Sequence, residues 1–224
     1  MKNQYDLCLE VLSRLQKAAV LEQILVIGSW CIYFYRNYFR DSTYSSSIRT
    51  RDIDFLVPIP TKFKKKINIP EMLRDLGFIE DFHRKGLIRL NHPELIIEFL
   101  VPEKGRGRDT PYPLPELGIN AQALRFLDFL IDNTIKLKFD NLKLNLPHPA
   151  AFGLHKLIIS SRRIKEEKRI KERQEAIRIL KILIKKGEEE KIIRLFEPMP
   201  RRWRTKVINA LEKDEDKKII DILI

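Results

Sequence analysis

The chain has 224 residues, of which 44% are hydrophobic, so it is long and apolar enough to bury a core and is not a disordered protein. No apolar run approaches the roughly 18 residues that a membrane span needs. The N-terminal segment also lacks the apolar core of a signal peptide. We therefore expect a cytoplasmic protein that does not enter a membrane. Two cysteines, Cys8 and Cys31, are too few for a disulfide framework.

The 43 Lys and Arg residues exceed the 31 Asp and Glu residues, which gives a formal charge of +12. Residues 1–146 carry 22 basic and 18 acidic residues, whereas residues 147–224 carry 21 and 13, a charge of +8. A basic surface attracts phosphate-bearing partners, which favours a nucleic acid or a nucleoside triphosphate as the partner. Solvated helices rich in Lys and Glu have the same composition, so charge alone leaves both interpretations open.

The first part of the chain mixes helical and strand patterns. Its predicted helices and strands are separated by polar or Pro-rich segments, of which 41–47 and 103–118 are the predicted loops, while 123–130 suits either a helix or a strand. The predicted helices cover 3–19, 30–39 and 70–78, and the predicted strands cover 21–27, 52–57, 87–91, 95–101, 134–139 and 142–146. We expect the strands at 87–91 and 95–101 to pair antiparallel.

After Pro147 the pattern is helical almost without interruption. The predicted helices there cover 149–160, 166–186, 188–196, 200–212 and 217–224. The sequence therefore predicts an α+β protein of two lobes, an α/β lobe at 1–146 and a basic helical lobe at 147–224.

Two carboxylates mark the predicted strand at 52–57. Because side chains alternate along a strand, Asp52 and Asp54 share one face while Ile53 and Phe55 lie on the other. Their Cα atoms are about 7 Å apart, at about 3.3 Å of rise per residue. Oxygen ligands at this spacing suit Mg²⁺, which keeps coordination positions for water and phosphate.

A third carboxylate, Glu98, interrupts a strand that is otherwise wholly apolar. A buried charge is costly unless it is offset. A metal ion shared with Asp52 and Asp54 would offset it, and so would an ion pair with an arginine such as Arg89 or Arg51. For the three acids together we favour the metal.

Gly28 and Ser29 lie between a predicted strand and a predicted helix. At such a junction the backbone N–H groups and a hydroxyl can hold a phosphate or a triphosphate tail. A Gly-Ser pair alone indicates only a tight turn, but the acidic pair on a following strand makes the combination more specific.

These segments, VIGSWCIYFY, RTRDIDFLVP and IIEFLVP, resemble the nucleotidyltransferase superfamily, which includes DNA polymerase β-like enzymes, kanamycin-type aminoglycoside nucleotidyltransferases and AbiEii-type toxins. A bacterial nucleotidyltransferase-like group related to those toxins is similar also at Leu117–Asp128 and Pro149–Arg163. The likeness covers most of residues 20–180, and the tail at 181–224 matches nothing in it.

The resemblance implies a nucleotidyltransferase-fold lobe with a mixed β-sheet, followed by a C-terminal helical lobe. It implies that Asp52 and Asp54 bind Mg²⁺ and that Glu98 is the third catalytic and metal-binding carboxylate. By analogy, an acceptor hydroxyl would attack the α-phosphorus of a nucleoside triphosphate and release pyrophosphate. Most relatives have Asp at the third position, and Glu is longer by one methylene.

Basic residues are the other candidates for nucleotide binding. Lys156 lies on the first helix of the second lobe, where it could reach a β- or γ-phosphate, and Arg162 and Arg163 follow about two turns later. Arg51, beside the acids, could bind phosphate or neutralise Glu98. Lys156 could instead be a surface cation on an amphipathic helix, and Arg162 and Arg163 could belong to a solvated face.

The leading hypothesis is a Mg²⁺-dependent nucleotidyltransferase that moves an NMP from an NTP to a hydroxyl acceptor. The charge of the helical lobe favours RNA, such as a tRNA end, over a small cationic molecule, and a protein hydroxyl is also open. The rival hypothesis is a catalytically silent protein of the same fold, acting as an RNA-binding or antitoxin-like partner module. The sequence leaves the oligomeric state open.

Overall fold

A computed structural model describes residues 3–40, 50–82, 86–103, 105 and 111–224. Its contacts divide the chain into two compact units, Met1–Pro147 and His148–Ile224, and each is described by itself. The predicted loop at 41–47 and part of that at 103–118 lie outside the described residues. Within the described residues, no helix is both long and apolar enough to cross a membrane.

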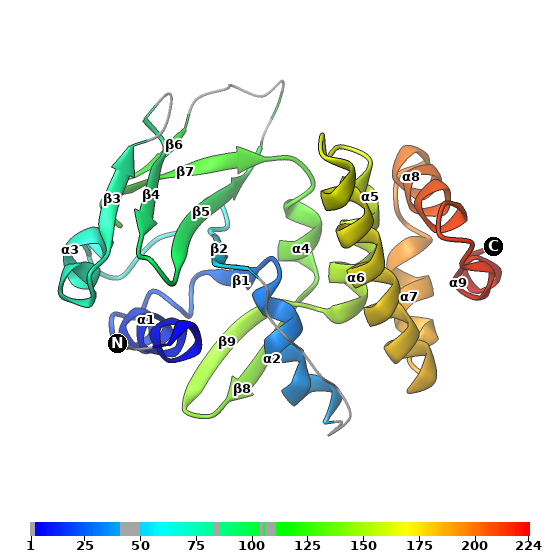
Figure 1. The fold of residues 1–224 in the computed structure, drawn as a ribbon, viewed down its shortest axis with the longest axis horizontal. Helices are drawn as coiled ribbons and strands as arrows, with labels where there is room; N and C mark the ends of the chain where they lie inside the picture. Colours follow the sequence, from blue (N-terminus) through cyan, green and yellow to red (C-terminus); the bar gives the residue numbers. More distant parts are fainter. Residues whose placement is uncertain (1–2, 41–49, 83–85, 104, 106–110) are drawn as a thin grey trace. The chain divides into compact units, whose positions relative to one another are not determined.

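The first unit is built on a mixed sheet (Figure 1). Its central strands follow the order β1-β2-β5-β4-β3, with β7 paired to β5 and β6 paired to β7. The strands of this unit are β1 (Leu25–Ile27), β2 (Asp52–Leu56), β3 (Ile79–Phe82), β4 (Ile88–Asn91), β5 (Ile96–Pro102), β6 (Tyr112–Leu114), β7 (Ile119–Leu124), β8 (Thr134–Phe139) and β9 (Leu142–Pro147). The helices are α1 (Gln4–Lys17), α2 (Trp30–Phe39), α3 (Ile69–Leu73), the short 3-10 helix η1 (Arg74–Leu76) and α4 (Asp128–Asp132).

Strand direction makes the sheet mixed. β2 runs parallel to β5, and β5 runs parallel to β7, whereas β1–β2, β4–β5, β3–β4 and β6–β7 are antiparallel pairs. The antiparallel pairing of β4 with β5 confirms the expectation for 87–91 and 95–101. The hairpin of β8 and β9 forms a separate two-stranded sheet that contacts β1 and α2.

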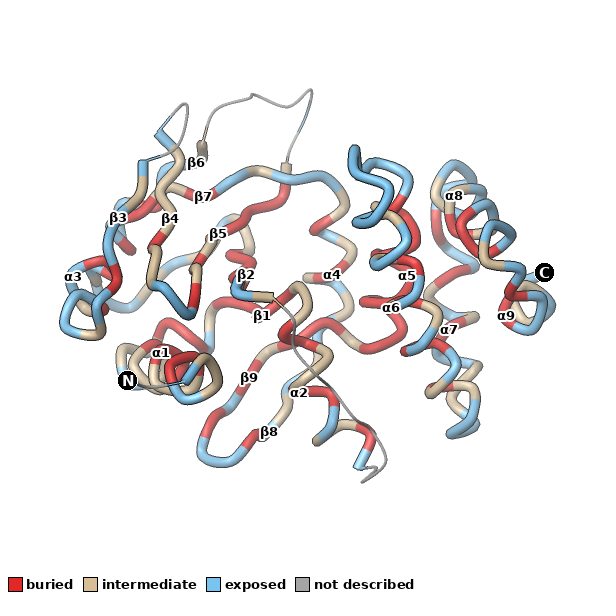
Figure 2. Tube along the Cα trace, viewed as in Figure 1, coloured by how far each residue is buried: buried red, intermediate tan, exposed pale blue. Residues whose placement is uncertain are grey.

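One face of the central sheet is the main apolar face. Ile53, Phe55 and Ile97 are buried there, and the rings of Phe55 and Phe99 stack with their centroids 5.3 Å apart. The hairpin is tied to the segment before β1 by Asn145, whose amide donates to the carbonyls of residues 21, 22 and 24. Figure 2 shows β5 and α5 drawn mostly as buried.

The second unit is helical. Its helices are α5 (Pro149–Ser160), α6 (Glu166–Lys185), α7 (Glu189–Phe196), α8 (Arg201–Glu212) and α9 (Lys217–Leu223). Helix α5 is the centre of this unit, because it contacts α6, α7 and α8 and is buried over nearly its whole length. The predicted α+β class, with a mixed sheet and a helical C-terminal part, is confirmed.

Three strands were not predicted. β3 has two acids in four residues and mostly exposed side chains, so its apolar alternation is weak. β6 lies inside the predicted loop at 103–118, and that prediction was wrong for Tyr112–Leu114, which pairs with β7 although it contains Pro113. The third unpredicted strand is β7, which ends inside the ambiguous segment 123–130, and the same segment holds the start of α4. β3 and β6 are short edge strands, which gain their structure from a neighbouring strand, and the local sequence pattern does not record that neighbour.

Gly153 marks the closest approach of α5 to α6. A Cβ atom placed there would lie 2.9 Å from both Cγ and Cδ2 of Leu180 on α6. We expect Gly153→Val to lower the free energy of unfolding by about 1–3 kcal/mol, because an overpacked interface must shift. Urea denaturation followed by far-UV circular dichroism measures this. Thr205→Val, on the exposed face of α8, is the control, and an equal loss in both variants would contradict the close approach.

Candidate active site

The parallel pairing of β2 with β5 brings two carboxylates side by side. Its register places Asp54 opposite Glu98 and Asp52 opposite Ile96. Residues opposite one another in a register point to the same face of a sheet, and so do residues two apart on one strand. All three predicted acids therefore lie on one face, with Asp54 and Glu98 as neighbours.

The same face carries an apolar cluster further along the strands. Its buried members on the sheet pack against Leu127 and Leu130, at and within α4, and they are Leu25, Ile27, Leu56 and Leu100. Helix α4 thus covers one end of this face. The carboxylates lie at the other end, where Asp52 is exposed and Asp54 and Glu98 are partly buried. Charged groups occupy the part of the face that this cluster does not cover.

Gly28 lies against the carboxylate of Asp54. β1 pairs antiparallel with β2 so that Ile27 is opposite Asp54, and Gly28 follows immediately. A Cβ atom on Gly28 would lie only 2.2 Å from Asp54 Oδ2, and Gly28 has a φ of +72°. Any other residue would both strain the backbone and displace the carboxylate. Ser29 is the N-cap residue of α2, and its carbonyl accepts a hydrogen bond from the N–H of Ile32.

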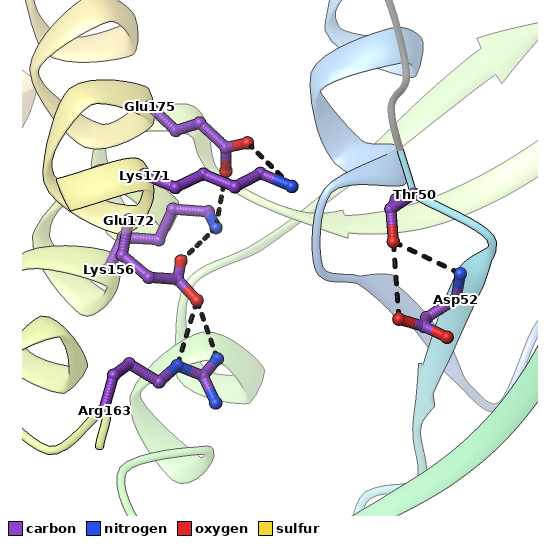
Figure 3. Close-up of polar contacts among 7 residues, drawn as sticks. All are labelled: Thr50, Asp52, Lys156, Arg163, Lys171, Glu172 and Glu175. Atoms are coloured by element: carbon purple, nitrogen blue, oxygen red, sulfur yellow. Dashed lines mark hydrogen bonds and ion pairs between the residues drawn. The ribbon is translucent and has the colours of Figure 1, made fainter. Parts of the chain in front are cut away.

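Asp52 and Arg51 differ in their surroundings. Thr50 Oγ1 accepts a hydrogen bond from the Asp52 N–H (3.2 Å) and donates one to Asp52 Oδ2 (3.4 Å), as Figure 3 shows. Arg51 precedes Asp52, so the alternation of the strand places it on the other face, and it donates to the carbonyl of His92 (3.1 Å). The structure therefore does not bring Arg51 together with the acids.

Glu98 forms an ion pair with Arg89 on β4. Arg89 Nε lies 2.5 Å from Glu98 Oε1, and the two side chains are 33% and 18% exposed. This is one of the two solutions that the sequence left open for the charge of Glu98.

Asp52 and Asp54 suit a hard divalent cation, but they provide only part of its ligands. Asp52 and Asp54 provide carboxylate oxygens on an accessible face, and Mg²⁺ is commonly held by one or two carboxylates together with substrate phosphates. The described residues contain no group of three or more His, Cys, Asp or Glu close enough to hold a metal ion by themselves. The two aspartates thus fit a metal that a nucleotide helps to bind, and a ligand role for Glu98 stays a prediction.

In the second unit, the predicted phosphate ligand Lys156 is 5% exposed and lies on α5. Its Nζ forms ion pairs with Glu172 and Glu175 of α6, the second at 2.8 Å. Arg163 pairs with the same Glu172 (2.7 Å), and Lys171 with Glu175 (3.8 Å), as Figure 3 shows. We call these five residues the Lys156 cluster. A nucleotide-binding role for Lys156 and Arg163 stays a prediction, and so does one for Arg162, which is exposed at the end of α5.

Burial and ion pairing shift the pKa values in this cluster in opposite directions. Burial by itself lowers the pKa of Lys156, but Glu172 and Glu175 raise it above its ordinary value. Burial by itself raises the pKa of Glu172, but Lys156 and Arg163 lower it. His155, next to Lys156, has no ion-pair or hydrogen-bond partner at its buried Nε2, and burial with the nearby cation lowers its pKa to about 3. His155 is therefore neutral at pH 7.

Sequence reasoning did not identify Glu172 and Glu175 as partners of Lys156. A signal was present, because Glu172 lies four residues before Ala176 and Glu175 four residues before Ile179, both buried on α6. Acids that continue an apolar helical stripe are expected to meet a buried cation.

Comparison with known proteins identifies the class. A model of a nucleotidyltransferase family matches residues 7–192, which is most of the chain, so the protein belongs to this nucleotidyltransferase family. None of the curated proteins compared with the chain matches it.

The chain is similar in structure to several solved proteins. An antigenic nucleotidyltransferase-like protein from Paracoccidioides brasiliensis is 14% identical, with a TM-score of 0.50 over 97% of this chain and 91% of that one. Two structures of the antibiotic-resistance factor ANT(2'')-Ia are more distant. Its solution structure is 10% identical (TM-score 0.46, 95% and 93% of the two chains), and its complex with adenylyl-2''-tobramycin is 9% identical (TM-score 0.47, 93% and 97%).

The close contact at Gly28 yields a test. We expect Gly28→Ala to lower the free energy of unfolding by about 1–2 kcal/mol more than Gly86→Ala, because both glycines have positive φ but only Gly28 has a neighbour within 4 Å. Urea denaturation in a Trp203→Phe background measures it, since Trp30 is then the only tryptophan and lies in the first unit. Equal losses would contradict the contact with Asp54.

A second test concerns the Lys156 cluster. We expect Lys156→Met to cost about 3–5 kcal/mol at pH 7, because buried carboxylates lose their cation. Because the pKa of Glu172 is lowered in the folded protein, this carboxylate stabilises the fold at pH values above its ordinary pKa of about 4.3. The stabilisation is lost as the pH falls through the lowered pKa. In the variant, the lowering by Lys156 is lost while burial, which raises that pKa, and Arg163, which lowers it, both remain, so Glu172 protonates at a higher pH than in wild type and protonation relieves part of the penalty on acidification.

The difference in unfolding free energy between wild type and Lys156→Met should therefore shrink between pH 7 and pH 5. Thermal and urea unfolding at several pH values measure this difference. Lys171→Met is the matched control, since the Lys171 side chain is 49% exposed and its pair should contribute less than about 1 kcal/mol. A loss that is equal in both variants, or independent of pH, would argue against the cluster as described.

Proposed function

We propose that this protein transfers an NMP from a nucleoside triphosphate to a hydroxyl acceptor, with Mg²⁺ held by Asp52 and Asp54. The observation that carries the proposal is the placement of Asp54 between the Gly28 turn and Glu98, at the end of the sheet face that α4 does not cover. Membership of a nucleotidyltransferase family supports it.

In this proposal, each residue has a separate task. Asp52 and Asp54 hold the cation, which when bound withdraws charge from the triphosphate and makes the acceptor oxygen a better nucleophile. The turn at Gly28 and Ser29 opens α2, where backbone N–H groups favour a phosphate. The acceptor oxygen forms a bond to the α-phosphorus, and the bond to the leaving pyrophosphate breaks. The proton of the attacking hydroxyl passes to solvent water.

We infer that the acceptor is RNA, such as a tRNA end, rather than a small cation. The support is the formal charge of +8 on residues 147–224 and the resemblance of several segments to toxin-type relatives. A protein hydroxyl is the other acceptor that this chemistry would serve.

A second candidate is the silent binding module. Two observations favour it: the ion pair of Glu98 with Arg89, and the pairing of both Lys156 and Arg163 with Glu172. In this alternative the same fold binds RNA without transferring a nucleotide.

The decisive experiment is incorporation of α-labelled NTPs, each supplied with Mg²⁺, into total RNA and cell extract. We expect Asp54→Asn to lower the rate on the order of 10³-fold, because a ligand acting in the transition state is lost. Asp140→Asn is the matched control, since Asp140 is exposed in the β8–β9 turn. Label in RNA supports the proposed acceptor, and label in protein supports the other one.

The melting temperature provides a reading that does not require the acceptor. Millimolar Mg²⁺ with NTP should raise it, because a ligand that binds only the folded protein stabilises it. Asp52→Asn should weaken that response. RNA binding without label incorporation, and with a melting temperature indifferent to Mg²⁺ and NTP, would favour the silent module.

A further inference from the structure

Four charged side chains from four neighbouring strands form one row across the sheet. The β3–β4 register places Asp81 opposite Arg89, and the β2–β5 register places Glu98 opposite Asp54. Between them, Leu90 of β4 is opposite Ile97 of β5, and the next residues, Arg89 and Glu98, form an ion pair. Opposite residues share a face. We call Asp81, Arg89, Glu98 and Asp54 the charged row; β3, β4, β5 and β2 lie in this order in Figure 1.

Glu98 lies between a cation and an anion in this row. Arg89 is on one side, at ion-pair distance, and Asp54 is its neighbour on the other. The guanidinium of Arg89 provides the positive charge of this row. Because Glu98 is only 18% exposed, its charge is less screened by water than that of a surface acid.

We propose that Arg89 is a positioning residue that competes with the divalent cation for the carboxylate of Glu98. Arg89 occupies the carboxylate of Glu98 through their ion pair. The cation therefore binds to Asp52 and Asp54, and it gains Glu98 as a ligand only when that ion pair breaks. The inference rests on the metal site of the proposed function. It goes beyond that proposal, because it makes an arginine on β4 the determinant of how tightly the site binds a metal ion.

The competition has a physical basis in the row itself. A cation beside Asp54 is repelled by the nearby guanidinium, and it also lacks the Glu98 oxygens that Arg89 holds. Removing Arg89 ends both of these effects. The affinity for a metal ion should then rise.

The experiment titrates Mn²⁺ alone, without nucleotide, into the full chain and measures free Mn²⁺ by electron paramagnetic resonance. We expect Arg89→Gln to tighten Mn²⁺ binding on the order of tenfold relative to wild type, which corresponds to about 1.4 kcal/mol. Arg89→Lys should stay near wild type, because it keeps the charge. The melting temperature of Arg89→Gln should also rise more on addition of Mn²⁺.

Two further variants separate competition for Glu98 from a general loss of positive charge. Arg125→Gln removes an arginine from another ion pair of the first unit, Arg125 with Glu103 (2.7 Å) beyond the other end of β5, and should leave Mn²⁺ affinity unchanged. In a Glu98→Gln background, Arg89→Gln should tighten binding by less than about threefold, since the contested carboxylate is gone.

An unchanged or weaker Mn²⁺ affinity in a folded Arg89→Gln protein would overturn the inference, and so would equal tightening in Arg89→Gln, Arg89→Lys and Arg125→Gln. The outcomes also separate this inference from the proposed function. If neither wild type nor Arg89→Gln binds Mn²⁺ without nucleotide, the inference fails, whereas the nucleotide-assisted site of the proposed function is judged separately by the melting-temperature response to Mg²⁺ with NTP. If both bind it with the same affinity, the metal site stands and only the role of Arg89 is removed.

Discussion

The parallel register of β2 and β5 is the constraint on which the rest of the site depends. It fixes Asp54 opposite Glu98, and two carboxylates at neighbouring positions repel one another unless a positive charge lies near them. The fold provides one such charge in Arg89, and the proposed chemistry provides another in Mg²⁺. Shifting the register by one residue would move Glu98 to the apolar face, where Phe55 and Phe99 stack.

The same face illustrates how a sheet can serve stability and chemistry together. Toward one end, Leu56 and Leu100 pack with the residues of α4 and bury apolar area. Toward the other end, two residues earlier on each strand, the side chains become Asp54 and Glu98. Gly28 completes this end because it has no side chain, so the turn before α2 can lie against the Asp54 carboxylate. A rigid core thus holds the acids in place.

Sequence reasoning predicted the elements whose patterns are local. The strand at 52–57, the helices after Pro147 and the common face of Asp52 and Asp54 follow from alternation and helical period. What it left open depends on pairing partners: the ion pair of Glu98 with Arg89 follows from the way β4 pairs with β5, and β6 exists only through β7. The partners of Lys156 likewise depend on how α5 and α6 pack.

The Lys156 cluster shows why a buried cation is weak evidence for a phosphate site. Taking Lys156 out of water is costly, and the fold offsets this cost with Glu172 and Glu175 on the neighbouring helix. A phosphate could replace those carboxylates only if it offered a comparable negative charge and if α6 released them. The ion pair of Arg89 with Glu98 is the more exposed of the two, with side chains 33% and 18% exposed, so the cost of separating its partners is smaller. Replacement of an ion-pair partner by a ligand is therefore easier at Arg89 and Glu98 on the sheet than at Lys156 between α5 and α6.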